Sequence, residues 1–528
     1  ILDIGTAQAN VLRISAIGAN PVFSNLSLFA QDTWKAGRDL TLTYGLRWEL
    51  NPPPSVSGGS LPGSVISFHS IAAVSAPLLP DEIRNVPPQN TSYANFAPRF
   101  GISYRIAGDT NHETILRGGI GVFYDLGAGY ASYGTYTGNT VANGPGQFPF
   151  IQGTIIRQNP TGNFTTLIDP EFKLPFTLRW SAGLERSLGE HQSISATYVA
   201  ALGRRLTNMA AVREPDLYYP DYGVVKNEGS SDYHSLQLQY RRRLTRGLQI
   251  LANHTWSHSI DLGSQDFQMG LERGSSDFDI RQSFSAAATY DLPALNFDSP
   301  IFKSKVFRLI SHNPLFPKSL KSDPRFVQSV QSIFRNWSID AIVRWQSALP
   351  FNPLASQLGG WVPGPNGEML IQDVRPDFVY GIPVYIKDNS APGGRRVNPE
   401  AFRPPPFLSG ELAENSAGVF RQGTLGRNAL RGYPFEQIDI TFHRRFNIKE
   451  NFALLFRADI FNLFNHSNFN NPEAKLYNIA AGESTNQFPP NFLFGKATST
   501  VGGAPGNINT LYQIGGPRSI QLSLKLEF

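Results

Sequence analysis

The sequence predicts an all-β protein, namely a transmembrane antiparallel β-barrel with about 13 strands in this chain. Three observations lead to this prediction. Apolar and polar residues alternate with a period of two in many segments, these segments are about twice as long as an ordinary strand, and the connections between them are short and long in turn. Short periplasmic turns and long extracellular loops are typical of transmembrane β-barrels.

The alternation identifies the strands in chain order. In "LTLTYGLRWEL", Leu40, Leu42 and Tyr44 begin one face, while Thr41 and Thr43 begin the other. A tilted strand needs about 9 to 11 residues to cross the hydrocarbon layer, so the segments are long enough to cross it. The expected strands span residues 23–35, 38–50, 96–107, 113–125, 175–187, 191–204, 232–244, 247–260, 280–292, 335–348, 434–447, 450–464 and 517–528.

The connections between the expected strands alternate in length along the chain. Those with the sequences "KAGR", "AGDTNH", "SLGEH", "TR" and "NIKE" are short, and segment 293–334 departs from the pattern because a short turn is expected there. Gly, Pro, Asn and Ser gather in the long connections, as is usual for loops. The long connections span 51–93, 126–174, 207–230, 262–278, 350–433 and 466–515.

A barrel also explains the charged residues within the strands. Every backbone amide in a bilayer must be hydrogen-bonded within the protein, so the sheet has to close, with an apolar outer face and a polar lumen. A water-soluble β-sandwich would show the same alternation, but strand length, loop asymmetry and aromatic residues near strand ends favour the barrel. The aromatic residues are Trp34, Trp48, Tyr104, Tyr290, Trp337 and Trp345, and the charged residues expected to face the lumen are Arg47, Arg99, Arg117, Arg179, Asp340, Arg344 and Asp439.

The composition limits the other possibilities. The 528 residues include no Cys, which excludes disulfides and thiolate metal sites, and the net charge is only +5. No apolar run is long enough for a transmembrane helix, and no strongly basic stretch predicts nucleic-acid binding. The chain begins without an initiator Met or a signal peptide, so we expect a piece of a longer protein. No cofactor is expected.

Three clusters have the residue types of a chemical site, and each has a simpler explanation. His254 and His258 have the spacing of a helical zinc site, but on a strand they lie about 13 Å apart, so we expect two side chains at the membrane interface. Asp277 and Asp279 could bind calcium or act in catalysis, yet a local structural role near the start of a strand is favoured. The basic segment "YRRRLTRG" (240–247) lies in an expected periplasmic turn. No nucleophile elbow, HExxH sequence or phosphate-binding loop is present, so no enzyme is predicted.

Several stretches resemble one family of membrane receptors. The segment "RADIFNLFNHSNFNNP" (457–472) resembles the penultimate-strand signature of TonB-dependent outer-membrane receptors. The stretches "LFAQDTWKAGRDLTLTYGLRWEL", "FAPRFGISYRI" and "SDYHSLQLQYRRRL" resemble the Oar-like branch of that family, and the resemblance covers nearly the whole chain. The signature residues are Arg457, Asp459, Asn462, Phe464, Asn465 and His466.

The resemblance implies a domain organisation. Receptors of this family have 22-stranded barrels filled by an N-terminal plug. This chain is expected to have about 13 strands, which would form the C-terminal part of such a barrel. Residues 1–22 would be the remnant of an extracellular loop and residues 23–528 the barrel portion, without the plug and the first strands. Because a sheet edge is not tolerated in lipid, the missing strands would come from the rest of the receptor or, alternatively, from other chains.

The resemblance also implies a function, which is TonB-dependent uptake of a bulky ligand, such as an oligosaccharide, a peptide or a chelate, across the outer membrane of a Gram-negative-type bacterium. Surface adhesion or protein export is the alternative, and a passive porin is a further one. The expected partners are outer-membrane lipid and lipopolysaccharide, the TonB complex through the plug, and the barrel assembly machinery. The sequence does not identify the ligand or the residues that bind it.

The C-terminal segment "RSIQLSLKLEF" keeps its alternation up to the last residue. Chain ends are usually frayed, so a strand that includes the last residue calls for an explanation. It is expected to be the closing strand, and a terminal aromatic residue on that strand resembles the recognition signal of the barrel assembly machinery. The residues of this signal are Leu522, Leu524, Leu526 and Phe528.

Overall fold

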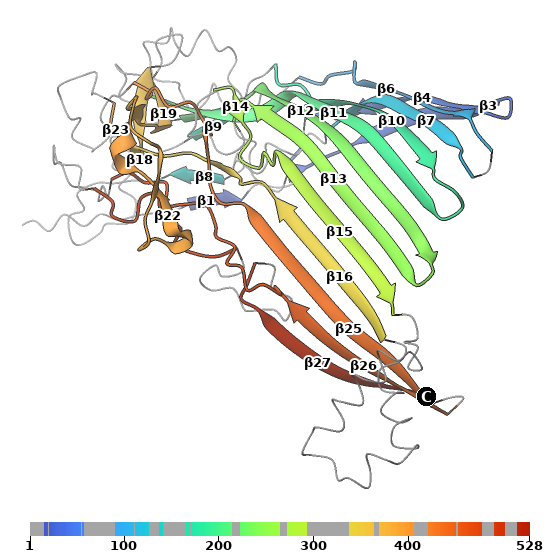
Figure 1. Cartoon of the computed structure of the whole chain (residues 1–528). Helices are drawn as coiled ribbons and strands as arrows, with labels where there is room; N and C mark the ends of the chain where they lie inside the picture. The colour runs from blue at the N-terminus through green and yellow to red at the C-terminus, as the bar shows by residue number, and fades with distance from the viewer. Residues whose placement is uncertain are drawn as a thin grey trace, which may run out of the picture.

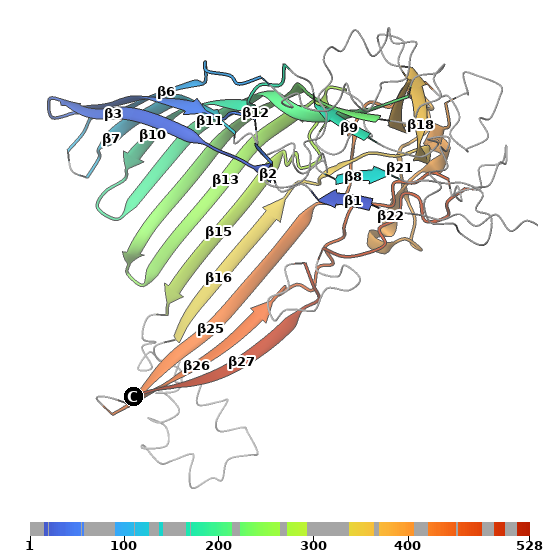
Figure 2. The same cartoon turned by 180° about the vertical axis from the view of Figure 1, so that it is seen from behind.

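The fold is dominated by one long antiparallel sheet. The computed structural model describes residues 15–18, 21–53, 55–56, 90–109, 111–125, 137–140, 165–168, 171–213, 222–263, 272–292, 337–363, 369–405, 421–449, 452–477, 490–501 and 515–528. Figures 1 and 2 show the strands side by side in a curved sheet, with most of the small strands gathered beyond one of its edges. The principal strands pair antiparallel in chain order. They are β3 (Leu26–Ala36), β4 (Leu40–Leu50), β6 (Phe96–Ala107), β7 (Thr114–Tyr124), β10 (Phe176–Ser187), β11 (Gln192–Arg213), β12 (Tyr222–Thr245), β13 (Leu248–Asp261), β15 (Gln282–Asp291), β16 (Trp337–Gln346), β25 (Phe435–Lys449), β26 (Phe452–Phe461) and β27 (Ser519–Glu527).

Each predicted strand is found in the structure, so the prediction of an all-β antiparallel fold is confirmed. One prediction about a loop is wrong. Segment 207–230 was expected to be a loop, but the described parts of it continue β11 and β12, which pair there with two further strands, at 369–374 and 165–168. The register shifts on both sides of Leu206, where Arg205 has a φ of 54°. Such β-bulges increase the local twist and let a hairpin leave the plane of its sheet.

The connections differ between the two ends of the strands. At one end of the strands, which we call the short-turn edge, β3 and β4 are joined through Gly37, with a φ of 88°. At the same end, β12 and β13 are joined through Arg246 and Gly247. A Cβ atom on Gly247 would lie 2.6 Å from the carbonyl oxygen of Asp291, so this tight turn requires glycine. At the opposite end, which we call the long-loop edge, β13, β16 and β26 enter long connections.

The register gives the sheet one polar face and one apolar face. Gln249, Thr289, Asp340, Thr441, Asp459 and Gln521 form one cross-strand row from β13 to β27. The row beside it, on the opposite face, is Ile250, Ala288, Ala341, Ile440, Ile460 and Ile520. On the apolar face Leu522 and Leu524 are each 68% exposed, which suits contact with lipid and would be unfavourable in water.

Short strands add structure around the main sheet. In the long connection after β16, β17 (Pro350–Phe351) pairs with β24 (Leu430–Arg431), β18 (Ser356–Pro363) with β19 (Met369–Val374), β20 (Asp377–Phe378) with β23 (Phe402–Arg403), and β21 (Tyr385–Lys387) with β22 (Arg395–Val397). Two 3₁₀ turns, η2 (Pro392–Gly394) and η3 (Pro399–Ala401), lie in the same connection. The other short strands are β1 (Ser15–Gly18), β2 (Pro21–Val22), β5 (Ser55–Val56), β8 (Thr137–Thr140), β9 (Thr165–Ile168) and β14 (Gly274–Ser275). Among the described residues, no helix is long and apolar enough to cross a membrane.

The described residues of the loops 262–281, 347–434 and 462–518 form what we call the loop layer. Its apolar core combines the second and third of these loops, because Phe402 packs edge-on against Phe494, with 5.8 Å between the ring centroids. A loop with a buried core of its own is more than a connection, since it can hold a surface in one conformation. The core residues are Phe351, Val397, Ala401, Phe402, Leu425, Leu476 and Phe494.

Candidate functional site on the polar face and in the loop layer

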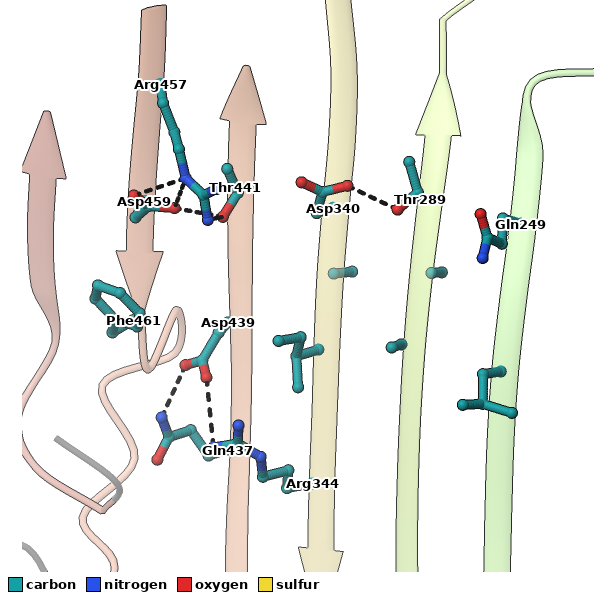
Figure 3. Close-up of a pocket in the computed structure, with 15 residues that line it drawn as sticks. Gln249, Thr289, Asp340, Arg344, Gln437, Asp439, Thr441, Arg457, Asp459 and Phe461 are labelled. Atoms are coloured by element: carbon teal, nitrogen blue, oxygen red, sulfur yellow. Dashed lines mark hydrogen bonds and ion pairs between the residues drawn. The ribbon is translucent and has the colours of Figure 1, made fainter. Parts of the chain in front are cut away.

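A concave site lies on the polar face between β13 and β26 (Figure 3). Its volume is about 670 Å³. Five strands contribute to it because successive polar-face positions share the register described above. The lining residues are Gln249, Leu251, Ala287, Ala288, Thr289, Asp340, Ala341, Ile342, Arg344, Gln437, Asp439, Thr441, Arg457, Asp459 and Phe461.

Two of the predicted lumen carboxylates are held by hydrogen bonds in this site. The Thr289 hydroxyl donates to Asp340 over 2.8 Å, and His443 Nε2 lies 3.3 Å from the same carboxylate. Asp439 accepts a hydrogen bond of 2.8 Å from the Gln437 amide, and Arg344 lies 3.9 Å from it. The site therefore presents carboxylate, amide and guanidinium groups whose positions are fixed by neighbours, which is how polar binding surfaces are built.

The signature residues Arg457 and Asp459 belong to the same site. Arg457 Nε donates to both carboxylate oxygens of Asp459, over 2.7 and 3.0 Å, and the Thr441 hydroxyl donates to Asp459 over 2.6 Å. Figure 3 shows these three side chains pointing toward one another. Arg457 and Asp459 both lie on β26, and the hydrogen bond from Thr441 to Asp459 joins β25 to β26 on the polar face.

The other signature residues shape the turn after β26. Asn462 is 1% exposed; its backbone amide donates to Asp439, and its side-chain amide donates to the carbonyl oxygens of His466 and Gly516. Asn465 accepts a hydrogen bond from the Arg518 amide, and both asparagines have a φ near 50°, which Asn tolerates better than most residues. His466 Nε2 lies 3.3 Å from Glu436, while Phe464 is exposed. Asn462 thus fastens the end of β26 to β25 and to the start of β27.

The remaining predicted lumen charges lie on the same polar face, farther along the sheet. Arg99 and Arg179 flank the ring of Phe123, at 4.5 and 5.4 Å from its centroid. Arg117 lies 3.4 Å from Glu185. In β4, Arg47 donates to Glu49 over 2.7 Å and to the Ser27 hydroxyl over 3.1 Å. The seven residues therefore share one face but form separate groups; that this face encloses a lumen stays a prediction.

The carboxylate of Asp279 is the centre of a second polar cluster, in the loop layer. It accepts hydrogen bonds from Arg431 over 2.5 Å, from Arg281 over 2.9 Å and from the Ser259 amide over 2.7 Å. Burial raises the pKa of Asp279, but the hydrogen bonds from Arg431, Ser259 and His258 outweigh it and leave the pKa below its usual range. The predicted local structural role of this aspartate is what these contacts provide.

Two buried arginines extend this cluster between loops. Arg427 donates to both the side chain and the carbonyl oxygen of Asp261, and only 2% of its side chain is exposed. Arg375 is 1% exposed and donates to Glu272 and to the Leu425 carbonyl oxygen. We call these contacts, with those of Asp279, the arginine clasp. The sequence alone did not identify it, and the available signal was a set of three arginines in the loop 347–434 and a group of carboxylates between residues 261 and 279.

His254 and His258 do not form a metal site. They pair with Leu238 and His234 on β12, so they occupy different rows of the sheet, and His258 lies 3.3 Å from Asp279. Nowhere in the described ranges do three or more His, Cys, Asp or Glu side chains gather to hold a metal ion. That the two histidines lie at the membrane interface stays a prediction.

The C-terminal strand has the predicted alternation. Ile520, Leu522, Leu524 and Leu526 are exposed on the apolar face, and β27 pairs with β26 from Ser519 to Glu527. Phe528 follows the strand and is 98% exposed. The function of these residues as an assembly signal stays a prediction.

Comparisons with known proteins agree with this architecture. The family model described as "Outer membrane beta barrel domain" matches residues 10–313 and 314–521. A search of curated protein sequences returned no match. The family assignment rests on the domain match, which covers most of the chain.

Solved structures of outer-membrane transporters are also similar, at low identity. They include the transporter YddB from Escherichia coli (10% identity, 96% of this chain, 45% of that chain, TM-score 0.44) and the FrpB iron transporter from Neisseria meningitidis, F3-3 variant (11%, 98%, 46%, 0.42). The ferric-catecholate import receptor Fiu from E. coli K12 is another (11%, 96%, 44%, 0.39). The chain spans less than half the length of each of these three proteins. By its domain match, the chain belongs to the outer membrane β-barrel domain family and lies in the outer membrane of a Gram-negative-type bacterium.

Proposed function

We propose that the chain is the C-terminal barrel portion of a TonB-dependent receptor, of the Oar-like branch, that takes up a bulky ligand. The observation that carries this proposal is the loop layer, in which the second and third long loops share a packed core and the arginine clasp ties the second loop to the first. A loop surface that is already ordered loses less conformational entropy when a ligand binds. A structural barrel would not need such a surface.

The polar face supports the same function. The site beneath the loop layer offers fixed carboxylate, guanidinium and amide groups at Asp340, Arg344 and Gln437. These groups can hydrogen-bond to an oligosaccharide, a peptide or a chelate, which are the ligand classes we propose. The TonB complex would act through a plug that precedes residue 1, so no residue described here contacts TonB in this proposal.

Uptake by the full-length receptor tests the proposal. Cells that express it, with and without TonB, are given labelled maltodextrins, oligopeptides and ferric chelates, and accumulation is measured. We expect one ligand class to accumulate only when TonB is present. Accumulation that is unchanged by the loss of TonB would contradict active transport. Conductance of the purified protein separates the remaining possibility, because a passive porin would be open without TonB.

A second candidate function is surface adhesion or protein export. It is favoured by large aromatic side chains on the loop layer, because Tyr380 is 84% exposed and Phe492 is also exposed. Exposed aromatic residues are enriched at contact sites between proteins. If adhesion is the function, deletion of 350–433 should abolish cell contact while the barrel still inserts. Unchanged contact after this deletion would count against adhesion.

A further inference from the structure

Charged side chains on the apolar face are distributed unequally between the two ends of the strands. The last two outward positions of each of the 13 principal strands at the short-turn edge include two described charged residues, Arg186 and Arg242. None of these positions holds Asp or Glu. The outward aromatic residues near this edge are Trp34, Tyr104, Tyr240, Tyr290, Trp337 and Phe446.

Outward charges at the long-loop edge have partners of opposite sign. Asp232 lies 2.7 Å from Arg204 and 2.5 Å from Arg273, and Glu436 lies 3.3 Å from His466. These contacts neutralise charge within the protein, which lowers the cost of placing it beside the membrane. The protein therefore has no need of a lipid counter-ion there.

Both arginines at the short-turn edge lack such a partner in the described part of the chain. In the part of the chain that the structure describes, neither Arg186 nor Arg242 forms an ion pair, and Arg242 Nε is buried without a hydrogen-bond partner. Arg444 lies one outward position farther from this end of β25, and its guanidinium lies over the ring of Phe446, 4.1 Å from the ring centroid. A guanidinium at the edge of the hydrocarbon layer is stabilised by an anion, and a phosphate accepts its hydrogen bonds in a bidentate manner.

The register brings Arg186 and Arg242 to one small area. Arg186 pairs with Ile194, Ile194 pairs with Tyr240, and Arg242 is the next outward residue after Tyr240. Two strand spacings and one outward repeat place the two Cα atoms about 12 Å apart. Between them, the Tyr240 hydroxyl donates to the Gln192 side chain over 2.7 Å, so the area has an ordered polar centre and an apolar border at Ile194.

We propose that Arg186 and Arg242 bind the phosphate of an anionic phospholipid in the periplasmic leaflet. The acyl chains would lie along the exposed apolar face, beside Leu184 and Ile194. Tyr240 would sit at the level of the headgroup, where aromatic residues with a polar end are favoured. In the basic segment 240–247, the outward Arg242 would therefore contact lipid, whereas Arg241 on the polar face would not.

Native mass spectrometry of the purified full-length protein can test this site. The protein is titrated with phosphatidylglycerol in competition with phosphatidylcholine. We expect the wild type to prefer phosphatidylglycerol, and R186Q/R242Q to lose about fivefold of the preference for each arginine removed. R186K/R242K keeps the charge and should keep most of the preference.

The matched control is R241Q/R243Q, which removes the same charge from neighbouring positions on the polar face, where Arg241 pairs with Leu251. It should leave the lipid preference unchanged; an equal loss in both double variants would overturn the proposal. Inorganic phosphate that displaces phosphatidylglycerol at equal phosphate concentration would overturn it too, because the site would then take a soluble anion. If R186Q/R242Q does not fold, the salt dependence of the wild type decides: a preference that does not fall with added salt rejects the arginine contact.

Discussion

The arginine clasp and the polar-face site use the same chemistry in different surroundings. In the clasp, Arg427 and Asp261 are almost fully buried, whereas in the polar-face site about half of the Arg457 side chain is exposed. Removing one partner of a buried pair leaves a charge without compensation, while an exposed pair is screened by water. The clasp should therefore determine the conformation of the loop layer, and the polar-face contacts should be available for exchange with a ligand.

Replacement of Arg427 by Met should have the largest effect. Asp261 would lose its buried cation, and the expected cost is about 3 to 5 kcal/mol of the stability of the loop layer. Hydrogen exchange should show faster exchange in 375–404 and 421–434 but unchanged protection of β13, β25 and β26. R421Q is a suitable control because Arg421, which pairs with Asp377, is more exposed. Equal protection of the loop layer in R427M and the wild type would show that the arginine clasp does not determine the conformation of that layer.

Replacement of Asn462 by Ala should have an intermediate effect. It leaves the carbonyl oxygens of His466 and Gly516 without their donor, which costs about 1 to 3 kcal/mol. Limited proteolysis should then cleave the connection after β26 earlier than in the wild type. N465A, at the exposed neighbouring turn position, should change cleavage less.

Acid should loosen the clasp in a defined range. The pKa of Asp279 is lower in the folded protein than in the unfolded chain, so its contacts stabilise the fold fully above the unfolded value of about 3.9. This stabilisation is lost as the pH falls from there through the folded pKa. The hydrogen-exchange rate of the loop layer, taken relative to the intrinsic rate at the same pH, should be independent of this group from about pH 5 to 8. This relative rate should rise below about pH 4. D279N should remove that acid-dependent step, and an identical step in D279N would assign it to another carboxyl group.

Replacement of Arg457 by Ala should have the smallest effect on stability, about 0.2 to 1 kcal/mol, because the pair with Asp459 is partly exposed. Thermal unfolding in detergent, followed by circular dichroism, would measure it. A loss as large as that of R427M would remove the distinction between the two polar clusters.

The strands and their faces could be predicted from the sequence, and the contacts between loops could not. The face on which Ile520 or Gln521 lies can be predicted from the residues next to it, because period-two alternation is a local property. Arg427 and Asp261 are 166 residues apart in sequence, so no local pattern joins them. The extension of β11 past Arg205 was missed because a bulge interrupts the alternation there.

The polar-face site was predicted in part for the same reason. Asp340, Arg344 and Asp439 were assigned to one face by alternation, but their meeting depends on the register of β16 against β25. The signature residues Asn462 and Asn465 were named through a resemblance, which says which residues recur without saying what they contact. Their backbone conformation, with a φ near 50°, explains why asparagine is suitable there.

The core of the loop layer sets an order of events in biogenesis. Phe351 and Phe402 follow β16, whereas Leu476 and Phe494 follow β26, so the core takes its members from chain segments on both sides of the β25–β26 hairpin. The contacts between the two segments, such as that of Phe402 with Phe494, cannot form until both segments have crossed the membrane. Once the core has formed, a strand that slid back would have to pull a folded body through the bilayer. Completion of the core should therefore make insertion of β16, β25 and β26 kinetically irreversible.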